Sequence, residues 1–475
     1  MNITPEQIDL LPSEELRPAL KKLLAEFELL SQRVARLEAE NEQLKQQLTG
    51  KTTSRNSSQP PSRDQKSNQP EPKVKKKHGA SFGHQKYSRP LVDNPDQVIQ
   101  IPVTECEHCL ADLSGVAPDD FEQRQITELP VAKPIIIETR QHHKTCPHCQ
   151  ELNRAPLPEG MEADRYFGPN LEAIIIFYKQ IQHLSYERVV ETMRELHGVI
   201  LSEGAVASIL QRAGEKAAPV AEAIKEQVLT GEVIRSDETS ARVEARNWWQ
   251  WVFISEHGVY HTIVKTRSFA EIETVLGELA VKIWVSDCFS SQLKAPAEVF
   301  QLCLAHQLRD LQKLVDATPE DLWALATQKL FREAIHLRNR FNSGELTLPG
   351  FMRRVTEIEN RLDDLLEEDL KLEEDLKNEA SRKLQNRFSK HRDKLLTFLN
   401  YPAVPPTNNE SEQALRGSVI HRKVTNGFRS KWGAKAYAAL QTIIATAKQK
   451  GEQTFQALVA LMGTPILPFL EVSSP

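Results

Sequence analysis

The N-terminal part of the chain repeats its apolar residues with the alternating three- and four-residue spacing of a coiled coil. Over four heptads the first core position is held by Leu20, Phe27, Val34, Asn41 and Leu48, and the second by Leu23, Leu30, Leu37 and Leu44. One asparagine at the first position favours a parallel dimer in a single register. We therefore predict a leucine zipper over residues 17–50, which forms a homodimer or higher oligomer through Leu23, Leu30, Leu37, Asn41 and Leu44. An amphipathic helix packed on its own chain is the alternative.

The heptad pattern stops at residues 51–95, which are polar and rich in proline and serine. This segment has few apolar residues with which to form a core, so its composition predicts a disordered linker. Between Lys51 and Arg89, ten Lys and Arg residues stand against Asp64 and Glu71, which gives a local charge of +8. The basic linker is either a solvated tether or a nonspecific contact to phosphate groups.

Residues 96–160 contain two C-x-x-C pairs, Cys106 with Cys109 and Cys146 with Cys149. Two such pairs can present four thiolates to one tetrahedral Zn²⁺. Alternating apolar residues predict strands around 123–129 and 135–141, and a small β-ribbon would fill the 36 residues between the pairs. We therefore predict a β module that binds one structural zinc through all four cysteines.

Residues 161–228 have helical periodicity, including a helix from Tyr186 to Leu196 and a turn at His197 and Gly198. A second helix begins after Ser202 and reaches about Arg212. Two helices joined by a short turn are typical of a helix-turn-helix, in which Arg212 would face outward and contact DNA. An ordinary helical bundle fits the same pattern.

From residue 229 the pattern changes to short apolar strands, and the first part of a catalytic domain is predicted over 229–315. Asp237 follows the first strand and Asp287 follows the last. If these strands are neighbours in a mixed sheet, the two carboxylates lie where they can share divalent cations. The predicted strands are 233–235, 248–254, 260–264 and 281–285, with a helix near 269–279.

Charge is segregated along the rest of the chain. Residues 316–400 form a long charged helical stretch, predicted as an insertion, and the catalytic domain resumes over 401–451 with a basic tail, followed by a C-terminal tail at 452–475. The whole chain has a net charge of −5, yet Gln413 to Gly451 contain eight Lys and Arg and no acidic residue. Such segregation is expected when one surface meets phosphate and another does not.

The 475 residues contain no apolar run that approaches the roughly 18 residues of a spanning helix. The first residues lack a basic start followed by an apolar stretch, so secretion is not expected. Paired cysteines in such a chain indicate metal binding in a reducing compartment before they indicate disulfides. A cytoplasmic protein with no membrane partner is therefore predicted.

Several motifs recur together in the second half: Asp237-Glu-Thr, Asn247-Trp-Trp-Gln-Trp-Val, Ser286-Asp287, Leu302-Cys303-Leu-Ala-His306-Gln-Leu-Arg309, Asn408-Asn409-x-x-Glu412-Gln-Ala-Leu-Arg416 and Arg422-Lys-Val-Thr-Asn-Gly-Phe-Arg-Ser. In these motifs the chain resembles the DDE transposases of bacterial insertion sequences, most closely the IS66 family. The resemblance spans nearly the whole chain, since members also carry a coiled coil, a Ser/Pro-rich linker, a cysteine zinc module and a helix-turn-helix. It implies an RNase H-like fold with Asp237, Asp287 and Glu412 as a metal-binding triad.

The fold expected is therefore multidomain α+β, with an RNase H-like mixed α/β catalytic domain that carries a helical insertion. The resemblance implies a bacterial, nucleoid-associated DNA transposase that cleaves transposon ends and joins the 3'-hydroxyl to target DNA. Two metal ions suit this phosphodiester chemistry, and carboxylates suit Mg²⁺ or Mn²⁺. The residues expected to clamp DNA phosphates are Arg416, Arg422, Lys423, Arg429 and Lys431.

Two residue choices remain within this assignment. Cys303 and His306 match a C-x-x-H signature of several DDE groups, and a buried thiol with a hydrogen-bonded core histidine is the alternative. Glu410 and Glu412 are both candidates for the third ligand, but they point about 200° apart on a helix (~100° per residue). Thr407 as N-cap with Glu410 would form a capping box, so we assign the metal to Glu412.

Two other functions compete with transposition. A zinc-containing DNA-binding regulator without catalysis would use the zipper, the zinc module and the helix-turn-helix, but it leaves the C-terminal half unexplained. A nuclease of the same RNase H-like fold would cut DNA without joining strands.

Overall fold

A computed structural model describes residues 89–129, 133–157, 165–367 and 377–463, together with Phe27, Leu30, Arg33 and Val34. Apart from these four residues, which are helical and exposed, the predicted zipper lies outside the described part of the chain, as does the linker up to residue 88. The main described segments divide into two compact units, residues 221–422 with 427–429, and residues 89–220 with 423–426 and 430–463. Within the described segments no helix is long and apolar enough to cross a membrane.

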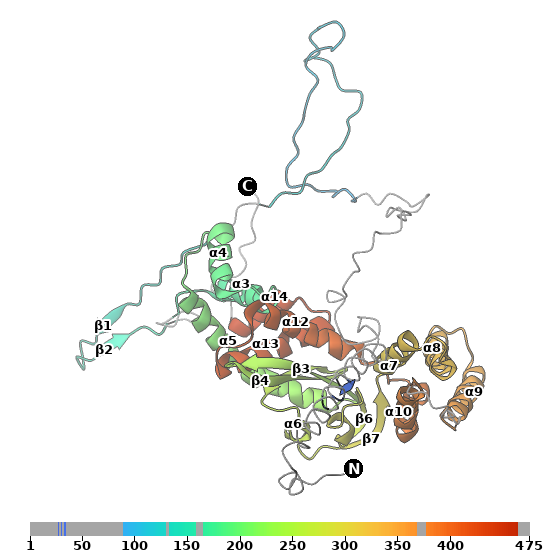
Figure 1. Cartoon of the computed structure of the whole chain (residues 1–475). Coiled ribbons are helices and arrows are strands. Elements are labelled where there is room, and N and C mark those ends of the chain that lie inside the picture. Colours follow the sequence, from blue (N-terminus) through green and yellow to red (C-terminus); the bar gives the residue numbers. More distant parts are fainter. Residues whose placement is uncertain are drawn as a thin grey trace, which may run out of the picture. The chain divides into compact units, whose positions relative to one another are not determined.

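A five-stranded mixed sheet lies at the centre of the first unit (Figure 1). In spatial order its strands are β5 (Gly258–Val264), β4 (Arg246–Ser255), β3 (Val233–Val243), β6 (Val281–Ser286) and β7 (Ala297–Leu302). β3, β4 and β5 pair antiparallel, whereas β6 and β7 run parallel to β3. The four predicted strands are confirmed, as is the helix before β6, α6 (Phe269–Leu276). β7 is a strand that the sequence pattern does not indicate.

Both faces of the sheet are covered, and successive residues of a strand alternate between them. Val233 and Ile283 pack into one apolar cluster with the helices that follow β7. Ile234 and Trp284 pack into a second cluster with α6 and the end of α5 (Glu203–Leu229). The alternation therefore directs the buried apolar residues of β3 and β6 into one or the other of two clusters.

β3 is longer than predicted. Its antiparallel pairing with β4 continues as far as Val243, so the strand does not end at Arg235. Asp237 consequently lies within β3 and not after it, while Asp287 directly follows β6 as expected. A long hairpin partner explains the difference, because pairing with β4 satisfies the backbone groups of β3 beyond the point where β6 ends.

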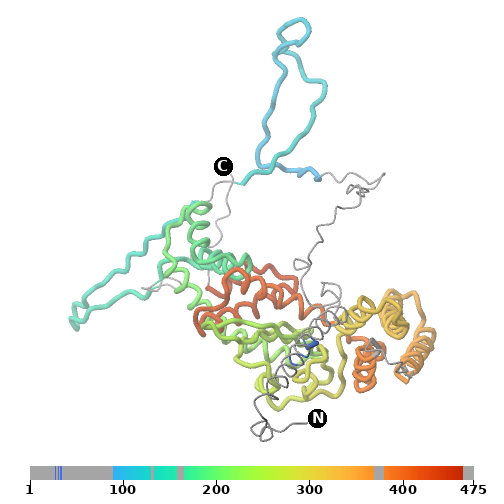
Figure 2. Tube along the Cα trace, in the orientation of Figure 1, coloured from blue at the N-terminus to red at the C-terminus, as the bar shows by residue number. Residues whose placement is uncertain are grey.

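The charged stretch between β7 and residue 400 is helical, as predicted, and packs on one face of the sheet. Figure 2 follows this insertion from yellow to orange. Although the insertion is highly charged, its helices also have buried apolar faces. In the third helix this face is formed, at helical spacing, by Phe351, Val355, Ile358 and Leu362. Its helices are α7 (Leu304–Ala317), α8 (Leu322–Asn342), α9 (Leu348–Glu367), α10 (Lys377–Lys390) and α11 (Thr397–Asn400), with 3₁₀ turns at Gln292–Lys294 before β7 and Arg392–Lys394 before α11.

The second unit is largely helical. It contains α3 (Pro169–Gln180), α4 (Tyr186–His197), the first part of α5 (Glu203–Leu229), α13 (Lys431–Gln449) and α14 (Thr454–Met462), while α12 (Asn409–Thr425) precedes α13. The predicted turn is confirmed, since Gly198 ends α4 in the left-handed conformation and the Ser202 hydroxyl accepts a bond from the Ala205 N–H at 3.1 Å. α5 continues to Leu229 and does not end near Arg212, because the alanine-rich segment that follows favours helix.

Arg212 does not face outward as predicted. Its guanidinium forms an ion pair with Glu172 of α3, whose side chain is fully buried. Arg165 binds the other oxygen of the same carboxylate at 2.6 Å. Burying a charged carboxylate is costly unless it is paired, and the two arginines supply that compensation. Arg212 therefore ties α5 to α3.

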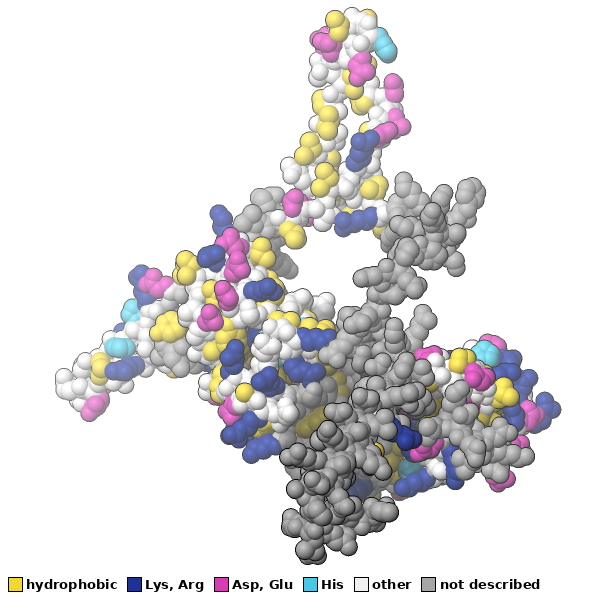
Figure 3. Space-filling view, viewed as in Figure 1, with side chains coloured by type: hydrophobic (Ala, Val, Ile, Leu, Met, Phe, Trp, Pro, Cys, Tyr) yellow, Lys and Arg dark blue, Asp and Glu magenta, His cyan; other side chains and the backbone are white. Residues whose placement is uncertain are grey.

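The strands predicted between the two cysteine pairs are absent from the described residues 121–129 and 133–141. Two other strands, β1 (His143–Thr145) and β2 (Leu152–Arg154), form a hairpin around the second pair. The alternating apolar residues stay exposed, with Ile126 and Ile136 more than nine-tenths accessible, and Figure 3 shows such yellow side chains on this part of the chain. Alternation creates an apolar face, but a strand also needs a partner to bury that face.

Candidate active site

Asp237 lies within β3, and Asp287 directly follows the neighbouring strand β6. The parallel pairing of β3 with β6 ends where Arg235 lies opposite Val285, so each aspartate comes two residues after this last pair. Asp237 is an even number of residues from Val233, and Asp287 is an even number of residues from Ile283. Because side chains alternate along a strand, both aspartates are directed to the face on which Val233 and Ile283 pack. The Asp287 carboxylate accepts a bond from the Phe289 N–H at 3.0 Å, which fixes it at the start of the loop. The predicted juxtaposition of the two aspartates is therefore present.

The electrostatics around Asp237 indicate a concentration of negative charge. Burial raises the pKa of Asp237 well above its usual value, and the charges of Glu238, Asp287 and Glu412 raise it further. Glu412 is thus within electrostatic reach of the first aspartate. Hard oxygen ligands that repel one another in this way are suited to a divalent cation such as Mg²⁺, which would relieve the repulsion.

Glu412, on α12, is held by the helix that follows β7. One guanidinium nitrogen of Arg309 donates to both of its carboxylate oxygens at 3.0 Å, and His306 Nε2 lies 3.6 Å from one of them. Glu410 turns elsewhere and forms an ion pair with Arg235 at 2.5 Å, with its own side chain 61% exposed. The two glutamates therefore have different surroundings, as expected for side chains that point about 200° apart on a helix.

The start of α12 differs from the prediction. The helix begins at Asn409, so Asn408 precedes it and Thr407 with Glu410 does not form the predicted capping box. The buried Asn408 side chain donates to the Ser236 carbonyl of β3 at 2.7 Å and accepts from the Ser411 hydroxyl at 2.7 Å. It therefore seats the helix of Glu412 directly beside Asp237. Sequence reasoning missed this residue, although an asparagine before a helical run is a familiar capping signal.

Cys303 and His306 lie beside Glu412. Their ligand atoms and that of Glu412 fall within 4.8 Å of one another, the only such group of three or more metal-binding side chains in the described part of the chain. The Cys303 sulfur accepts the Asn408 N–H at 3.1 Å, and burial raises the pKa of this thiol. Burial, and next the Arg309 charge, lower the pKa of His306. Sulfur, nitrogen and oxygen ligands suit zinc, but a zinc ion here would compete with Arg309 for Glu412.

The basic residues predicted to bind DNA lie on α12 and after it. Arg422 donates to Ser240 of β3. Residues 427–429 pair beside the end of the same strand, where the Phe428 N–H donates to the Arg242 carbonyl at 2.7 Å. Gly427 makes this approach possible, because its φ is +101° and a β-carbon would lie 2.4 Å from that carbonyl oxygen. The remaining predicted residues are all exposed: Arg416, Lys423, Arg429 and Lys431.

The two cysteine pairs form the same local turn. Main-chain bonds of 2.9 Å run from Leu110 to Cys106 and from Gln150 to Cys146, and Leu110 and Gln150 share a φ near +60°. Hydrogen bonds from His108 and then Cys109 lower the pKa of Cys106, and bonds from Cys149 and then His148 lower that of Cys146. Each turn thus favours a thiolate, the form that binds zinc. The structure does not bring the four thiols into one cluster among the described residues.

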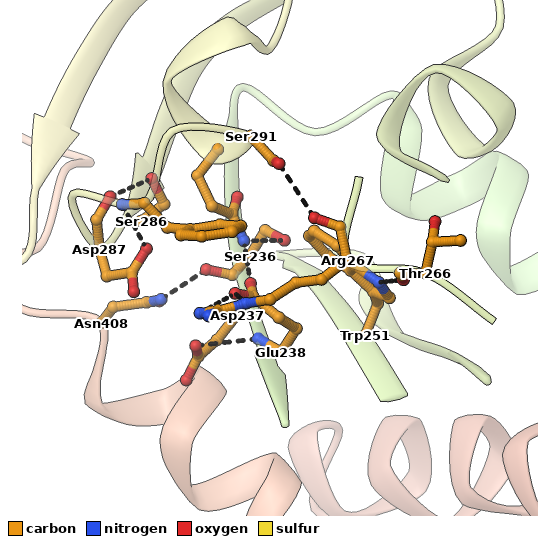
Figure 4. A network of polar contacts seen from close by, with 12 residues as sticks. Ser236, Asp237, Glu238, Trp251, Thr266, Arg267, Ser286, Asp287, Ser291 and Asn408 are labelled. Carbon is orange, nitrogen blue, oxygen red and sulfur yellow. Dashed lines mark hydrogen bonds and ion pairs between the residues drawn. The ribbon is translucent and has the colours of Figure 1, made fainter. Parts of the chain in front are cut away.

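A buried ion pair that the sequence analysis did not single out lies behind Asp237 (Figure 4). Glu238 is fully buried and binds Arg267 at 2.5 Å and Gln292 at 2.6 Å. The only signal in the sequence was an acidic residue at an inward position of a strand. Its partners come from the loops after β5 and β6, so no local pattern could have identified them.

Comparison with known proteins assigns the chain to a family. Residues 164–436 match the model described as the transposase IS66 family, and residues 2–90 match a family of unknown function, DUF6444. An uncharacterized protein of Sinorhizobium fredii, y4hP, is 23% identical over 387 residues, which cover 74% of this chain and 69% of that protein. Since the first match spans more than half of the chain and contains Asp237, Asp287 and Glu412, the chain belongs to the IS66 family of transposases.

Proposed function

We propose that this chain is a DDE-type DNA transposase, which cleaves the ends of its element and joins the resulting 3'-hydroxyl to target DNA. The observation that carries the proposal is the proximity of Asp237, on β3, to Asp287, directly after the neighbouring parallel strand β6, with Glu412 within electrostatic reach. The strand order, three antiparallel strands followed by two parallel ones, supports an RNase H-like fold for this unit.

Asp237, Asp287 and Glu412 would hold Mg²⁺ or Mn²⁺, and such ions supply activation of a nucleophilic oxygen and stabilisation of the leaving oxygen. Asp237, which feels the charges of both Asp287 and Glu412, would be a ligand shared by the bound ions. Asn408 would keep Glu412 in place by fixing its helix to β3. Arg309 neutralises Glu412 in this structure and would have to yield part of that carboxylate when the cation binds. Cys303 and His306 would then have a structural role beside Asn408 and Glu412.

DNA is the partner that membership of a transposase family implies. Arg416, Lys423, Arg429 and Lys431 are exposed and lie in residues 413–451, a segment without acidic residues, so they would be suited to contact phosphates. Arg422 would act on DNA from its position beside Ser240. We propose that α4 and α5 act as a helix-turn-helix, which would bind DNA with residues other than Arg212, because Arg212 is engaged by Glu172.

Two assemblies complete the proposal. The matching turns at Cys106–Cys109 and Cys146–Cys149 would join around one structural Zn²⁺. The zipper over residues 17–50 would pair two chains through Leu23, Leu30, Leu37, Asn41 and Leu44. Deletion of residues 17–48 should shift sedimentation from dimer to monomer, and a deletion that stays fully dimeric would remove this interface.

The decisive experiment uses the full chain and a DNA that carries the two ends of its element. Wild-type protein with Mg²⁺ should cut the ends and transfer them to a second DNA, whereas Asp237→Asn and Asp287→Asn should bind DNA and do neither. Because asparagine keeps the shape of aspartate and removes its charge, a change in folding cannot account for the loss if DNA binding persists. Cleavage without joining would indicate a nuclease, and binding without cleavage by the wild type would indicate a regulator.

A further inference from the structure

Glu238 is a charged side chain in an apolar environment, on the face of the sheet opposite Asp237. Neighbouring residues of a strand point to opposite faces, so Glu238 shares its side with Ile234 and with Trp251, its cross-strand neighbour. The side chain is fully buried. An apolar residue would satisfy this position at lower cost in stability, because buried ion pairs rarely repay the loss of hydration. Packing alone therefore does not explain why an acidic residue occupies this position.

The partners of Glu238 converge on the loop that begins with Asp287. Gln292 donates to the Glu238 carboxylate at 2.6 Å and accepts the indole N–H of Trp284 at 3.1 Å, which fixes the far end of the loop. The Arg267 guanidinium, bound to the same carboxylate, lies 3.7 Å from the centre of the Phe289 ring. The Ser291 hydroxyl donates to the Arg267 carbonyl at 3.0 Å.

This network and Asp287 hold the same five-residue loop from two sides of the sheet, as Figure 4 shows. At its near end Asp287 accepts the Phe289 N–H, and the ring of that same Phe289 is stacked on Arg267. A change in the position of Arg267 is thus transmitted through one residue to the Asp287 carboxylate. Glu238 in turn sets the position of Arg267, and it is directly joined along the chain to Asp237.

We propose that Glu238, with Arg267, Phe289 and Gln292, is a positioning network that holds Asp287 against Asp237 in the geometry that binds a divalent cation. The inference rests on the proposed function, because it takes the two aspartates to be metal ligands. Glu238 does not itself touch the cation or the DNA. It acts from the reverse face of the sheet, where the carboxylate is protected from water and from the substrate.

The test measures Mn²⁺ binding to the full chain, by the electron paramagnetic resonance signal of the free ion, without any DNA or catalysis. Residues that orient metal ligands typically change metal affinity 10- to 100-fold when replaced. We expect Glu238→Gln to raise the Mn²⁺ dissociation constant by about tenfold or more. Phe289→Leu and Gln292→Met should raise it in the same direction, although they change no charge. Melting curves will show whether each variant remains folded.

Asp363→Asn provides the control, because it breaks an ion pair of similar geometry with Arg392 in the helical insertion, at 2.5 and 3.0 Å. It should leave Mn²⁺ affinity unchanged. Weakened binding in Glu238→Gln alone would show an effect of charge, and unchanged affinity in all three network variants would show a purely structural ion pair. Either result overturns the positioning network. If Asp237→Asn and Asp287→Asn also leave Mn²⁺ affinity unchanged, the proposed metal site itself fails.

Discussion

The acidic end of the sheet and the two cysteine turns, the two proposed metal sites, differ in how completely they are assembled. At the sheet, Asp237 and Asp287 are brought together by the pairing of β3 with β6, and Asn408 fixes the helix of Glu412 beside them. At the turns, local hydrogen bonds shape each cysteine pair, but the four thiols do not meet in the described structure. The protein core thus holds the acidic residues close together. In the cysteine segments each pair has a defined turn, but the two pairs are not brought together.

The difference predicts what each proposed metal would contribute. The acidic site is supported by two buried apolar clusters, so a cation there would adjust side chains and leave the fold unchanged. The cysteine segments expose most of their apolar side chains, and a zinc ion would supply the cross-link that their small size cannot replace. The following experiments test this contrast.

The largest effect is expected at the third carboxylate. Glu412→Gln should lower Mg²⁺-dependent cleavage by a thousandfold or more, equivalent to about 4 kcal/mol in the barrier, because the amide loses the charge that holds the cation. The rate of cleavage of an end-containing DNA measures this directly. Glu410→Gln is the matched control, since it removes the charge of an exposed glutamate that pairs with the mostly buried Arg235, and it should leave cleavage intact at a cost in stability of about 1 to 3 kcal/mol. The opposite pattern would show that Glu410 is the ligand.

The cysteine turns should respond to a single substitution by losing their metal altogether. Full-length protein should contain about one zinc per chain, and Cys146→Ser should lose it because four ligands are needed for a closed structural site. Proteolysis should then cut residues 89–157 faster, while the melting of the sheet unit stays the same. Zinc content that survives the substitution would contradict the four-cysteine site, and Cys288→Ser offers a control cysteine outside it.

A smaller effect is expected where residues 427–429 meet β3. Gly427→Ala should lower the free energy of unfolding by about 1 to 3 kcal/mol, because alanine adopts a φ of +101° only under strain. The Arg242 carbonyl at 2.4 Å adds a backbone clash. Gly344→Ala is the matched control, since its φ is also positive but open space surrounds it. Denaturant melts of equal midpoint for the two variants would show that the close approach to β3 does not matter.

The smallest effect separates structural from DNA-binding arginines. Arg416→Ala should reduce the slope of DNA affinity against salt by about one and leave stability unchanged, as loss of one phosphate contact predicts. Arg212→Ala should instead lower the melting temperature of the helical unit, because buried Glu172 loses one of its two cations, with the salt slope unchanged. If Arg212→Ala changed the salt slope and not the stability, the original outward orientation would be right.

Local patterns in the sequence predicted the helical segments and most strands of the sheet, but not the end of α5 or the start of α12. The apolar runs of β4, β5 and β6 and the turn at Gly198 were visible without any partner. The prediction of strands between the cysteine pairs was wrong, because an alternating sequence does not by itself provide the second strand that would bury their apolar faces. The predicted length of β3 was too short, because pairing with the long strand β4 extends β3 to Val243.

The sequence by itself determined the acidic residues, their order and the strand that carries or precedes each aspartate, because those features depend on neighbours within a few positions. Tertiary structure alone decided that Asn408 joins α12 to β3, that Arg212 turns inward to Glu172, and that Glu238 meets Arg267 and Gln292. Each of these contacts joins residues 29 or more positions apart. A buried charge or amide takes its partner from whichever element the folded core brings within hydrogen-bond distance, and no local pattern encodes that choice.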